Sequence, residues 1–553
     1  MRARWLVGSI VVALVAVGVA YATLGRSEDP TGEAASRTAR IQQGGTLRYA
    51  ADAEPSGFNI YTSKGNSTAL QNVVANLYPS VFRTHPDFVV RLDQTFMDSA
   101  ELTNQRPQTV TYKIKQDAVW SDGTPVTAAD FAYLWSNCNG KNQDIDCVST
   151  VGYQDIGSVS GADGGKTVTV AFKTPFADWR SLFANILPSH YVKAQRGGWN
   201  TGLDKNPERI PSGGPFRIAS FSPGQSLTMA RNERYWGPRA PLDRIVFRLI
   251  PDVAAQVEAL QGGEVDLIYP RPQVDLVRRV QRLPGVRSQL NFGLSFEHLD
   301  FNLHHPVLAD LRVRRAIALA IDQRQLLERT VGLLSDQAQV LGNRIWLTGQ
   351  PQYEDHAGGY GKGDVQAAMR LLEQAGWRRG ADGVYAKDGR ALQLRYTTNT
   401  GESTRESVGL LLQAQLKRAG IDLRIANTKA DTLFGEWLPH GNFDLAEFAW
   451  IGTPFAVSSN PDIYRTKGSQ NYGGLSDPTV DALFRQATAE LDPERAAGIA
   501  NQIDRELWRT LPTIPLFQRA SFIAWRGTLV NVGDNPTAEG LFWNAGTWGY
   551  TSK

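Results

Sequence analysis

Residues 392–425 read LQLRYTTNTGESTRESVGLLLQAQLKRAGIDLRI, and this stretch decides the fold. Residues 392–396 alternate apolar and polar side chains, which predicts a strand. Residues 408–416 place Val and Leu at helical spacing, and Gly420 marks the end of that helix. A second alternating run follows at 421–425. The order strand, helix, strand predicts parallel strands with a helix packed on the sheet.

The same pattern continues outward from this stretch. Helices are predicted at 310–321 and 365–372, and a third strand at 443–450. The chain is therefore expected to form an α/β fold with a largely parallel sheet in its second half. Ligands of such sheets bind beyond the carboxyl ends of the strands, which here lead into loops 397–402 and 451–460.

Length and charge narrow the classes of function. The chain has 553 residues, which is too long for one ordinary core. It carries 58 basic and 55 acidic residues, so it has no strong field to attract nucleic acid. We expect a globular protein that does not bind nucleic acid.

The N-terminus predicts export. Two arginines precede an apolar run at 5–24, which indicates a signal peptide or membrane anchor over residues 1–25. Residues 20–22 read Ala-Tyr-Ala, typical of a cleavage site, but the run is also long enough to span a membrane. Both alternatives stay open, and 26–43 is expected to be a flexible tether. No cysteine stands near the run, so we expect no lipid attachment.

Cys138 and Cys147 are the two cysteines of the chain, and nine positions separate them in a polar loop. Thiols outside the cytoplasm tend to oxidise. We therefore predict one local disulfide between them.

No catalytic pattern emerges from the sequence. None of the seven histidines falls in an H-E-x-x-H spacing, there is no G-x-S-x-G elbow, and the cysteines do not form C-x-x-C. Residues 164–167 read Gly-Gly-Lys-Thr, but a strand follows where a phosphate loop needs a helix, so a hairpin turn is favoured. We expect no enzyme activity, cofactor or metal, although a carboxylate pair typical of an exported hydrolase stays possible.

Several segments together resemble the family 5 solute-binding proteins, the extracellular receptors of oligopeptide and dipeptide ABC importers. The resemblance runs from about residue 44 to the C-terminus, and the order of its motifs makes it specific. These motifs are WSDGTPVTAADF at 120–131, SGGPF at 212–216, RNERYW at 231–236, GEVD at 263–266, LRVRRAI at 311–317, LL-x-x-AG at 371–376, FD at 443–444, and NY at 471–472 with Pro478 and Asp481.

The resemblance implies a two-lobed periplasmic-binding-protein-like fold, type II and cluster C-like, with an extra α/β domain on lobe one. Its lobes close around a ligand by a hinge motion. Mapped onto this chain, lobe one takes residues 44–78, 205–298 and 526–553. The extra domain takes 79–204, and lobe two takes 299–525.

The resemblance also implies a receptor that works outside the cytoplasm, in the cell envelope or periplasmic space. It would bind a peptide in the cleft between the lobes, pass it to ABC permease subunits and act as a monomer. An oligosaccharide, haem or metal chelate is the alternative ligand. An exported hydrolase and a sensor are the competing classes of function.

The resemblance points to the loop after the third strand as a ligand contact. In the oligopeptide receptors an Asp three positions beyond the Trp at Trp450 meets the ligand's amino terminus, but here that position is the uncharged Thr453. Glu447 stands where some relatives hold a cation for the ligand carboxylate. Phe455 is a further expected contact in this loop, and core packing is the alternative role for Trp450.

Four more candidate ligand contacts come from strand ends. Glu54 and Asn59 follow the first strand, at positions that line the cleft in the family. Asn399 follows the strand at 392–396, and Arg405 after it can serve a ligand carboxylate or lie on a solvated helix face.

Overall fold

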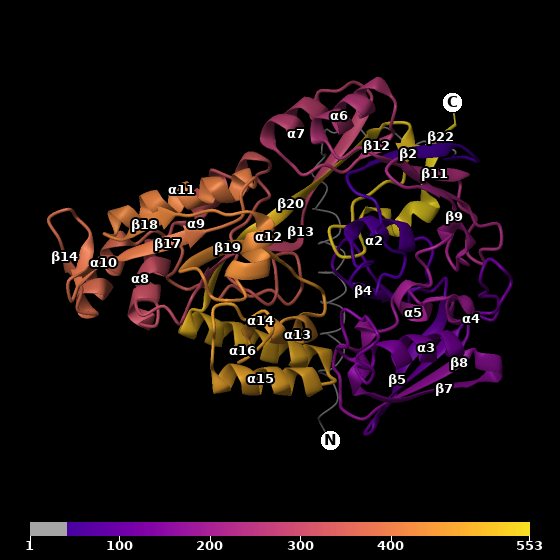
Figure 1. Ribbon diagram of the computed structural model, residues 1–553, viewed down its shortest axis with the longest axis horizontal. Helices are drawn as coiled ribbons and strands as arrows, with labels where there is room; N and C mark the ends of the chain where they lie inside the picture. The colour runs from indigo at the N-terminus through magenta and orange to yellow at the C-terminus, as the bar shows by residue number, and fades with distance from the viewer. Residues whose placement is uncertain (1–40, 553) are drawn as a thin grey trace, which may run out of the picture.

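The computed structural model describes residues 41–552 (Figure 1). The predicted signal peptide or anchor at 1–25 lies outside the described residues, as does most of the tether. Within the described part, no helix is both long and apolar enough to cross a membrane.

A ten-stranded sheet runs through the molecule in the order β18-β17-β19-β13-β20-β12-β2-β11-β10-β9. Its two long strands, β13 (Val286–Phe301) and β20 (Thr513–Arg526), pair antiparallel and join two bodies (Figure 1). We call the body built on β2 and β9–β12 the first lobe and the body built on β17–β19 the second lobe. The other strands of the sheet are β2 (Thr46–Ala51), β9 (Phe216–Ser222), β10 (Ser226–Arg231), β11 (Arg244–Leu249), β12 (Leu267–Ile268), β17 (Gln393–Thr397), β18 (Asp422–Ile425) and β19 (Leu445–Ile451).

The pairing of β13 with β20 is interrupted where the lobes meet. Residues 286–292 pair in regular register, and pairing resumes at Phe296. A second irregularity in the register places Pro515 opposite His298. An irregularity is expected at a proline within a sheet, because proline has no N–H to donate to the neighbouring strand. The two lobes are thus connected through strands with locally broken pairing, a structure suited to bending.

The first lobe packs its sheet against helices and against the end of the chain. The ring of Phe542 lies edge-on to Tyr49 of β2, with 5.0 Å between centroids. Its helices are α2 (Thr68–Val74), α6 (Val253–Gly262) and α7 (Val274–Gln281); the C-terminal segment adds a 3-10 turn at Leu541–Thr547 and a small sheet of β1 (Ile41–Gln42), β22 (Gly549–Thr551) and β21 (Leu529–Val530).

A separate four-stranded sheet, in the order β5-β6-β8-β7, forms a domain beside the first lobe. We call it the β5–β8 domain. Thr127 and Asp130 make a capping box that begins α3, and Cys138 at its end is bonded to Cys147, which confirms the predicted disulfide. Its elements are β3 (Phe82–Thr84), β4 (Val90–Leu92), β5 (Met97–Gln105), β6 (Gln108–Ile114), α3 (Ala128–Cys138), β7 (Ile156–Ala162), β8 (Thr167–Phe172), α4 (Ser189–Ala194) and α5 (Gly198–Thr201).

The second lobe contains the stretch that decided the fold. The predicted strands at 392–396 and 421–425 are β17 and β18, and they are parallel, as predicted. The predicted helix lies within α11, and Gly420 after it has the left-handed φ of +79° that ends a helix. The helices of this lobe are α8 (Leu311–Ala320), α9 (Gln323–Glu328), α10 (Val365–Gln374), α11 (Ser403–Arg418), α12 (Ala430–Thr432), α13 (Ala456–Ser459), α14 (Pro461–Tyr464), α15 (Pro478–Ala489) and α16 (Pro493–Thr510); a small sheet of β14 (Arg378–Arg379), β15 (Tyr385–Lys387) and β16 (Arg390–Ala391) follows α10.

The expectation of a largely parallel sheet is wrong for the centre of the sheet. β17 pairs parallel with β18 and β19, but β19 pairs antiparallel with β13, and β13 with β20. The reason is that the chain enters and leaves the second lobe through the two long strands, which run in opposite directions. Periodicity within 392–450 carries no information about these distant partners.

Candidate ligand-binding cleft

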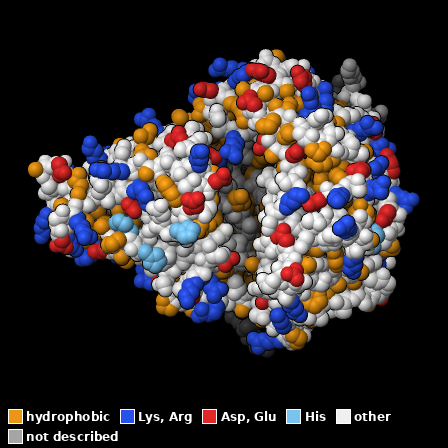
Figure 2. Space-filling model, in the orientation of Figure 1, with side chains coloured by type: hydrophobic (Ala, Val, Ile, Leu, Met, Phe, Trp, Pro, Cys, Tyr) orange, Lys and Arg blue, Asp and Glu red, His pale blue; other side chains and the backbone are white. Residues whose placement is uncertain are grey.

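A groove of about 580 Å³ separates the β5–β8 domain from the second lobe. Figure 2 shows the molecule hollowed between its two bodies. The walls are mostly apolar and aromatic, with a few charged side chains. From the β5–β8 domain and its neighbouring hairpin come Phe82, Phe88, Val90 and Arg180, and from the second lobe come Trp346, Gln350, Pro454, Phe455 and Val457.

Phe88 projects from the tight turn between β3 and β4. Its φ of +64° is a left-handed conformation that costs a non-glycine residue about 1 kcal/mol. The side chain packs against a cluster formed by Leu294 and Phe296 of β13 and Leu347 of the second lobe. Gly349 gives it room, because a Cβ there would lie 2.7 Å from the Phe88 ring. The turn therefore contacts the opposite wall of the groove.

The loop after β19 forms part of the second-lobe wall. Trp450 is half-buried and stacks between two rings, with centroids 5.7 Å from His298 and 6.1 Å from Tyr472. The Thr453 hydroxyl accepts a hydrogen bond of 3.1 Å from the backbone N–H of Phe455, which fixes the loop. Phe455 lines the groove, as predicted for a contact residue.

The backbone of β19 has an unpaired edge beside this loop. On one side β19 pairs with β13 along residues 445–451, but on the other its register with β17 ends at Ala446. From Glu447 onward, no described strand covers that second edge, and Ile451 is 75% exposed. Free N–H and C=O groups on a strand edge can pair with another extended chain.

A polar contact also closes the groove. The backbone N–H of Ser458 donates a 2.8 Å hydrogen bond to the carboxylate of Asp178 in the β5–β8 domain. Burial raises the pKa of Asp178, and the hydrogen bonds from Ser458 only partly oppose this rise. The backbone N–H of Ala177 donates to the carbonyl of Thr488 at 2.9 Å. Two neighbouring backbone segments therefore join the domain to the second lobe.

Three predicted site residues meet in a buried charged cluster under α11. The guanidinium of Arg405 is not on a solvated face: it is buried, donates to Glu297 of β13 at 2.9 Å and donates also to Asn399. Glu447 is fully buried and accepts a hydrogen bond from the hydroxyl of Tyr396. Burial and then the charge of Glu297 raise the pKa of Glu447 well above its usual value. Arg405 and Glu297 therefore pair within the fold, and Glu447 is directed to Tyr396.

A cavity of about 90 Å³ lies beside that cluster, and sequence reasoning missed it. Arg519 of β20 faces it and stands 3.5 Å from Glu297 and 3.6 Å from Glu402. Both distances exceed the usual N–H···O range of about 2.7–3.2 Å, so Arg519 has donors to spare. Arg271 of the first lobe bonds Glu402 at 2.8 Å across the cavity. The polar side chains of Gln518, Arg519 and Ser521 in the middle of a mostly apolar strand were the available signal.

Glu54 and Asn59 lie in the first lobe, apart from these groups. Glu54 accepts a 2.7 Å hydrogen bond from the backbone N–H of Gly224 and lines a small cavity of about 20 Å³. The buried amide of Asn59 donates to the carbonyl of Trp199 at 2.8 Å and accepts from the N–H of Tyr61. Asn59 therefore uses its polar atoms within the fold.

Comparisons with known proteins agree with this architecture. Residues 98–472 match the family described as bacterial extracellular solute-binding proteins, family 5 middle. The oligopeptide-binding protein OppA of Mycobacterium tuberculosis is 34% identical over 508 residues, covering 91% of this chain and 84% of its own.

Two solved structures show the likeness in three dimensions. A periplasmic EDTA-binding protein, EppA, matches with a TM-score of 0.87 and 28% identity over 93% of this chain and 98% of its own. Bacillus subtilis AppA in complex with a nonapeptide matches with a TM-score of 0.74 and 21% identity over 93% of this chain and 100% of its own. The predicted α/β solute-binding-protein fold is thus confirmed over nearly the whole chain. The prediction that it binds without catalysing a reaction agrees with a family of binding proteins. The chain belongs to family 5 of the bacterial extracellular solute-binding proteins.

Proposed function

We propose that the protein captures peptides between its lobes and delivers them to an ABC permease. The observation that carries this proposal is the unpaired edge of β19, from Glu447 to Ile451, beside an apolar groove. An extended peptide would add to this edge through main-chain hydrogen bonds, which all peptide sequences offer. The apolar walls would accept varied side chains. The 34% identity to an oligopeptide-binding protein supports the same ligand class.

The end groups of the peptide would meet different surroundings. Thr453 carries no charge, so the loop after Trp450 offers no counter-ion for a free amino terminus. Arg519 makes only long ion pairs, 3.5 Å from Glu297 and 3.6 Å from Glu402, so its guanidinium can also donate to a ligand carboxylate. We therefore expect the ligand to bind with its acidic end near Arg519.

The proposal includes the division of the chain into moving parts. Lobe one would take residues 44–78, 205–298 and 526–553, lobe two 299–525, and the extra domain 79–204. Boundaries at 298 and 525 fall within the long strands β13 and β20. The interrupted pairing of those strands would be the hinge, and the monomer would close around one ligand.

A metal chelate is the second candidate ligand. Its support is the same arginine, since a polycarboxylate chelate would use the spare donors of Arg519, and EppA, described as EDTA-binding, has a TM-score of 0.87 with this chain.

Ligand-dependent thermal stabilisation separates the candidates. The purified protein would be tested with peptides of two to ten residues, oligosaccharides, haem and metal–EDTA. We expect stabilisation by peptides. Stabilisation by sugars, haem or chelates alone would overturn the peptide assignment.

A further inference from the structure

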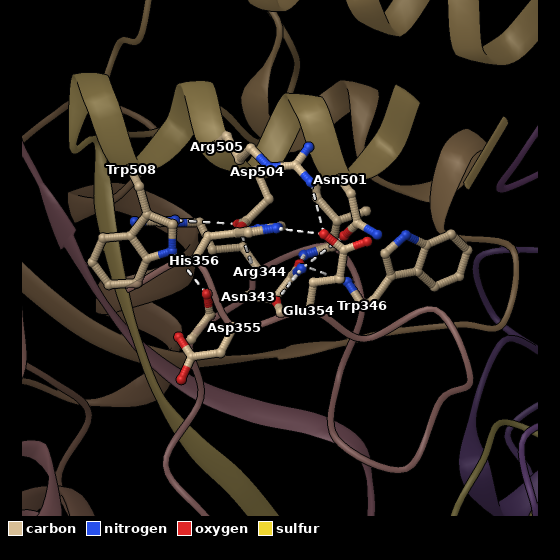
Figure 3. A network of polar contacts seen from close by, with 12 residues as sticks. Asn343, Arg344, Trp346, Glu354, Asp355, His356, Asn501, Asp504, Arg505 and Trp508 are labelled. Atoms are coloured by element: carbon tan, nitrogen blue, oxygen red, sulfur yellow. Dashed lines mark hydrogen bonds and ion pairs between the residues drawn. The ribbon is translucent and has the colours of Figure 1, made fainter. Parts of the chain in front are cut away.

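The segment 342–361 of the second lobe connects the groove with helix α16. Trp346, Gln350 and Gln352 of this segment line the groove. The two flanks of the segment lie against α16, where a network of polar contacts holds them (Figure 3). A change at α16 can therefore reach the groove wall through this segment.

Asp504 of α16 is the centre of the network and touches both flanks (Figure 3). Its Oδ1 accepts hydrogen bonds from the backbone N–H of Arg344 at 2.9 Å and from the guanidinium of Arg344 at 3.2 Å. Its Oδ2 lies 2.8 Å from Nδ1 of His356. One buried carboxylate thus ties together two points of the segment on either side of its groove-lining residues.

Asn501, one turn earlier on α16, links the network to the groove residues through hydrogen bonds. Its amide donates to the carbonyl of Gln352 at 3.0 Å and accepts from Asn343 at 3.0 Å. Asn343 in turn accepts from the backbone N–H of Trp346 at 2.9 Å. The wall position of Trp346 is thereby fixed relative to α16.

The buried ion pair has no solvent to replace its partners. Both Arg344 and Asp504 have fully buried side chains, and the Arg344 guanidinium lies 4.1 Å from the ring centroid of Trp508. Removing one charge of such a pair leaves the other uncompensated, which is strongly unfavourable. The segment would then shift to bring water or another partner to the remaining charge.

We propose that Asp504 is a positioning residue for ligand binding: it touches no groove residue but sets the groove wall through Arg344 and His356. This inference rests on the proposed function, because it takes the groove as the ligand site.

Protonation of His356 makes the wall sensitive to pH. Both contacts of its ring are carboxylates, Asp504 at 2.8 Å and Glu354 at 3.0 Å, and a neutral imidazole can donate to only one of them. The other charges that face it are Arg505 of α16, which bonds Glu354 at 2.7 Å, and Arg344 beyond Asp504.

The direction of this effect follows from the pKa. The hydrogen bond to Asp504 raises the pKa of His356, burial opposes the rise and Glu354 adds to it. A raised histidine pKa means that the contacts are complete at low pH and are lost as pH rises through the folded-state value. The wall should loosen, and affinity should fall, as pH rises from the ordinary histidine pKa of about 6.5 through the raised folded-state pKa.

The test compares the full-length protein with Asp504→Asn, His356→Gln and His356→Lys, and uses Glu494→Gln as a control elsewhere on α16. The probe is an N-acetylated alanine-rich peptide with a free carboxyl end, which does not titrate in this range. We expect Asp504→Asn to weaken binding by about tenfold. Binding is measured below and above the histidine transition. His356→Lys, which stays charged, should bind the peptide tightly at both pH values, and His356→Gln should bind it weakly at both.

Hydrogen exchange of segment 342–361 provides a readout that needs no ligand. Exchange is compared as protection factors, which remove the intrinsic base-catalysed rise of the rate with pH. A lower protection factor in His356→Gln, and in wild type at the higher pH, supports the inference even if Asp504→Asn fails to fold. Wild-type exchange and wild-type pH dependence in both His356 variants would overturn it. If wild type binds no peptide while exchange still responds to pH as expected, the peptide assignment fails and the positioning by the network stands.

Discussion

The backbone amide of Ser458 lies 2.8 Å from the carboxylate of Asp178, although 280 positions separate the two residues. This contact joins the β5–β8 domain to the loop that follows Trp450, so it forms only when the groove is narrow. It places a half-buried acidic group in the wall of the groove. Closure of the groove should therefore depend on the chemistry of residue 178.

Replacement of Asp178 tests that dependence. Asp178→Ala leaves the Ser458 N–H without its acceptor and should disfavour the closed form by about 1–2 kcal/mol. Asp178→Asn keeps an acceptor and removes a half-buried charge, so closure should be at least as favourable as in wild type. Because burial raises the pKa of Asp178, the closed form binds the proton more tightly, and closure of wild type should strengthen as pH falls. Small-angle scattering with and without peptide measures closure; identical profiles for the Ala variant and wild type would contradict this role.

Trp450→Ala should weaken peptide binding by about 2 kcal/mol or more if the indole contacts the ligand. Calorimetry at fixed pH measures the loss. Phe434→Ala is the control, since Phe434 also packs on Phe448 but is exposed and does not belong to the loop after β19. Equal, small effects in both folded variants would move the ligand site away from the β19 loop.

Glu447→Gln should stabilise the protein at neutral pH. Burial raises the pKa of Glu447, so its favourable contribution is present at low pH and lost as pH rises from the unfolded pKa, about 4.3, toward the folded one. The amide oxygen of Gln can still accept from Tyr396. Melting temperatures should differ little near pH 4 and favour the variant near pH 7. A variant less stable than wild type at both pH values would show that Glu447 is ionised and required.

Arg519→Met should reduce affinity for peptides with a free carboxyl end far more than for their amides. The reason is that Arg519 makes only long ion pairs with Glu297 and Glu402, so its guanidinium can still donate to a ligand carboxylate. Arg271→Met removes a charge from the same cavity, but Arg271 already donates a 2.8 Å hydrogen bond to Glu402, so this variant should not discriminate between acid and amide. An acid-to-amide preference unchanged in Arg519→Met would exclude this arginine as the carboxylate contact.

Local features of this fold could be predicted from sequence, whereas contacts between distant segments could not. The strand–helix–strand unit around α11 and the disulfide between Cys138 and Cys147 depend on nearby residues, and both are confirmed. Arg405 shows the opposite case. Its partner Glu297 is 108 positions away on β13, and only the antiparallel pairing of β13 with β19 brings that strand beneath α11. Periodicity near Arg405 cannot reveal such a partner.

The same limit explains the missed groups of the cleft. Asp178 and Phe88 line the groove, whereas Arg519 faces the smaller cavity beside the charged cluster. The three residues come from separate regions of the chain, and no motif links them. Trp450 ends one predicted strand and Thr453 and Phe455 follow it, so a single stretch of sequence carried all three predictions; the structure places Phe455 in the groove wall. The resemblance to a family predicted the loop after β19, whereas the opposite wall of the groove became visible only in the structure.

Calorimetric titration with a matched pair of peptides tests the central claim most directly. One peptide has an ordinary backbone, and the other has the same sequence with alternate amide nitrogens methylated, which removes the donors needed to pair with β19. We predict that the ordinary peptide binds and that methylation weakens its binding by at least tenfold, about 1.4 kcal/mol. Equal binding of both peptides, or binding of neither while a chelate or sugar binds, would contradict peptide capture at the β19 edge.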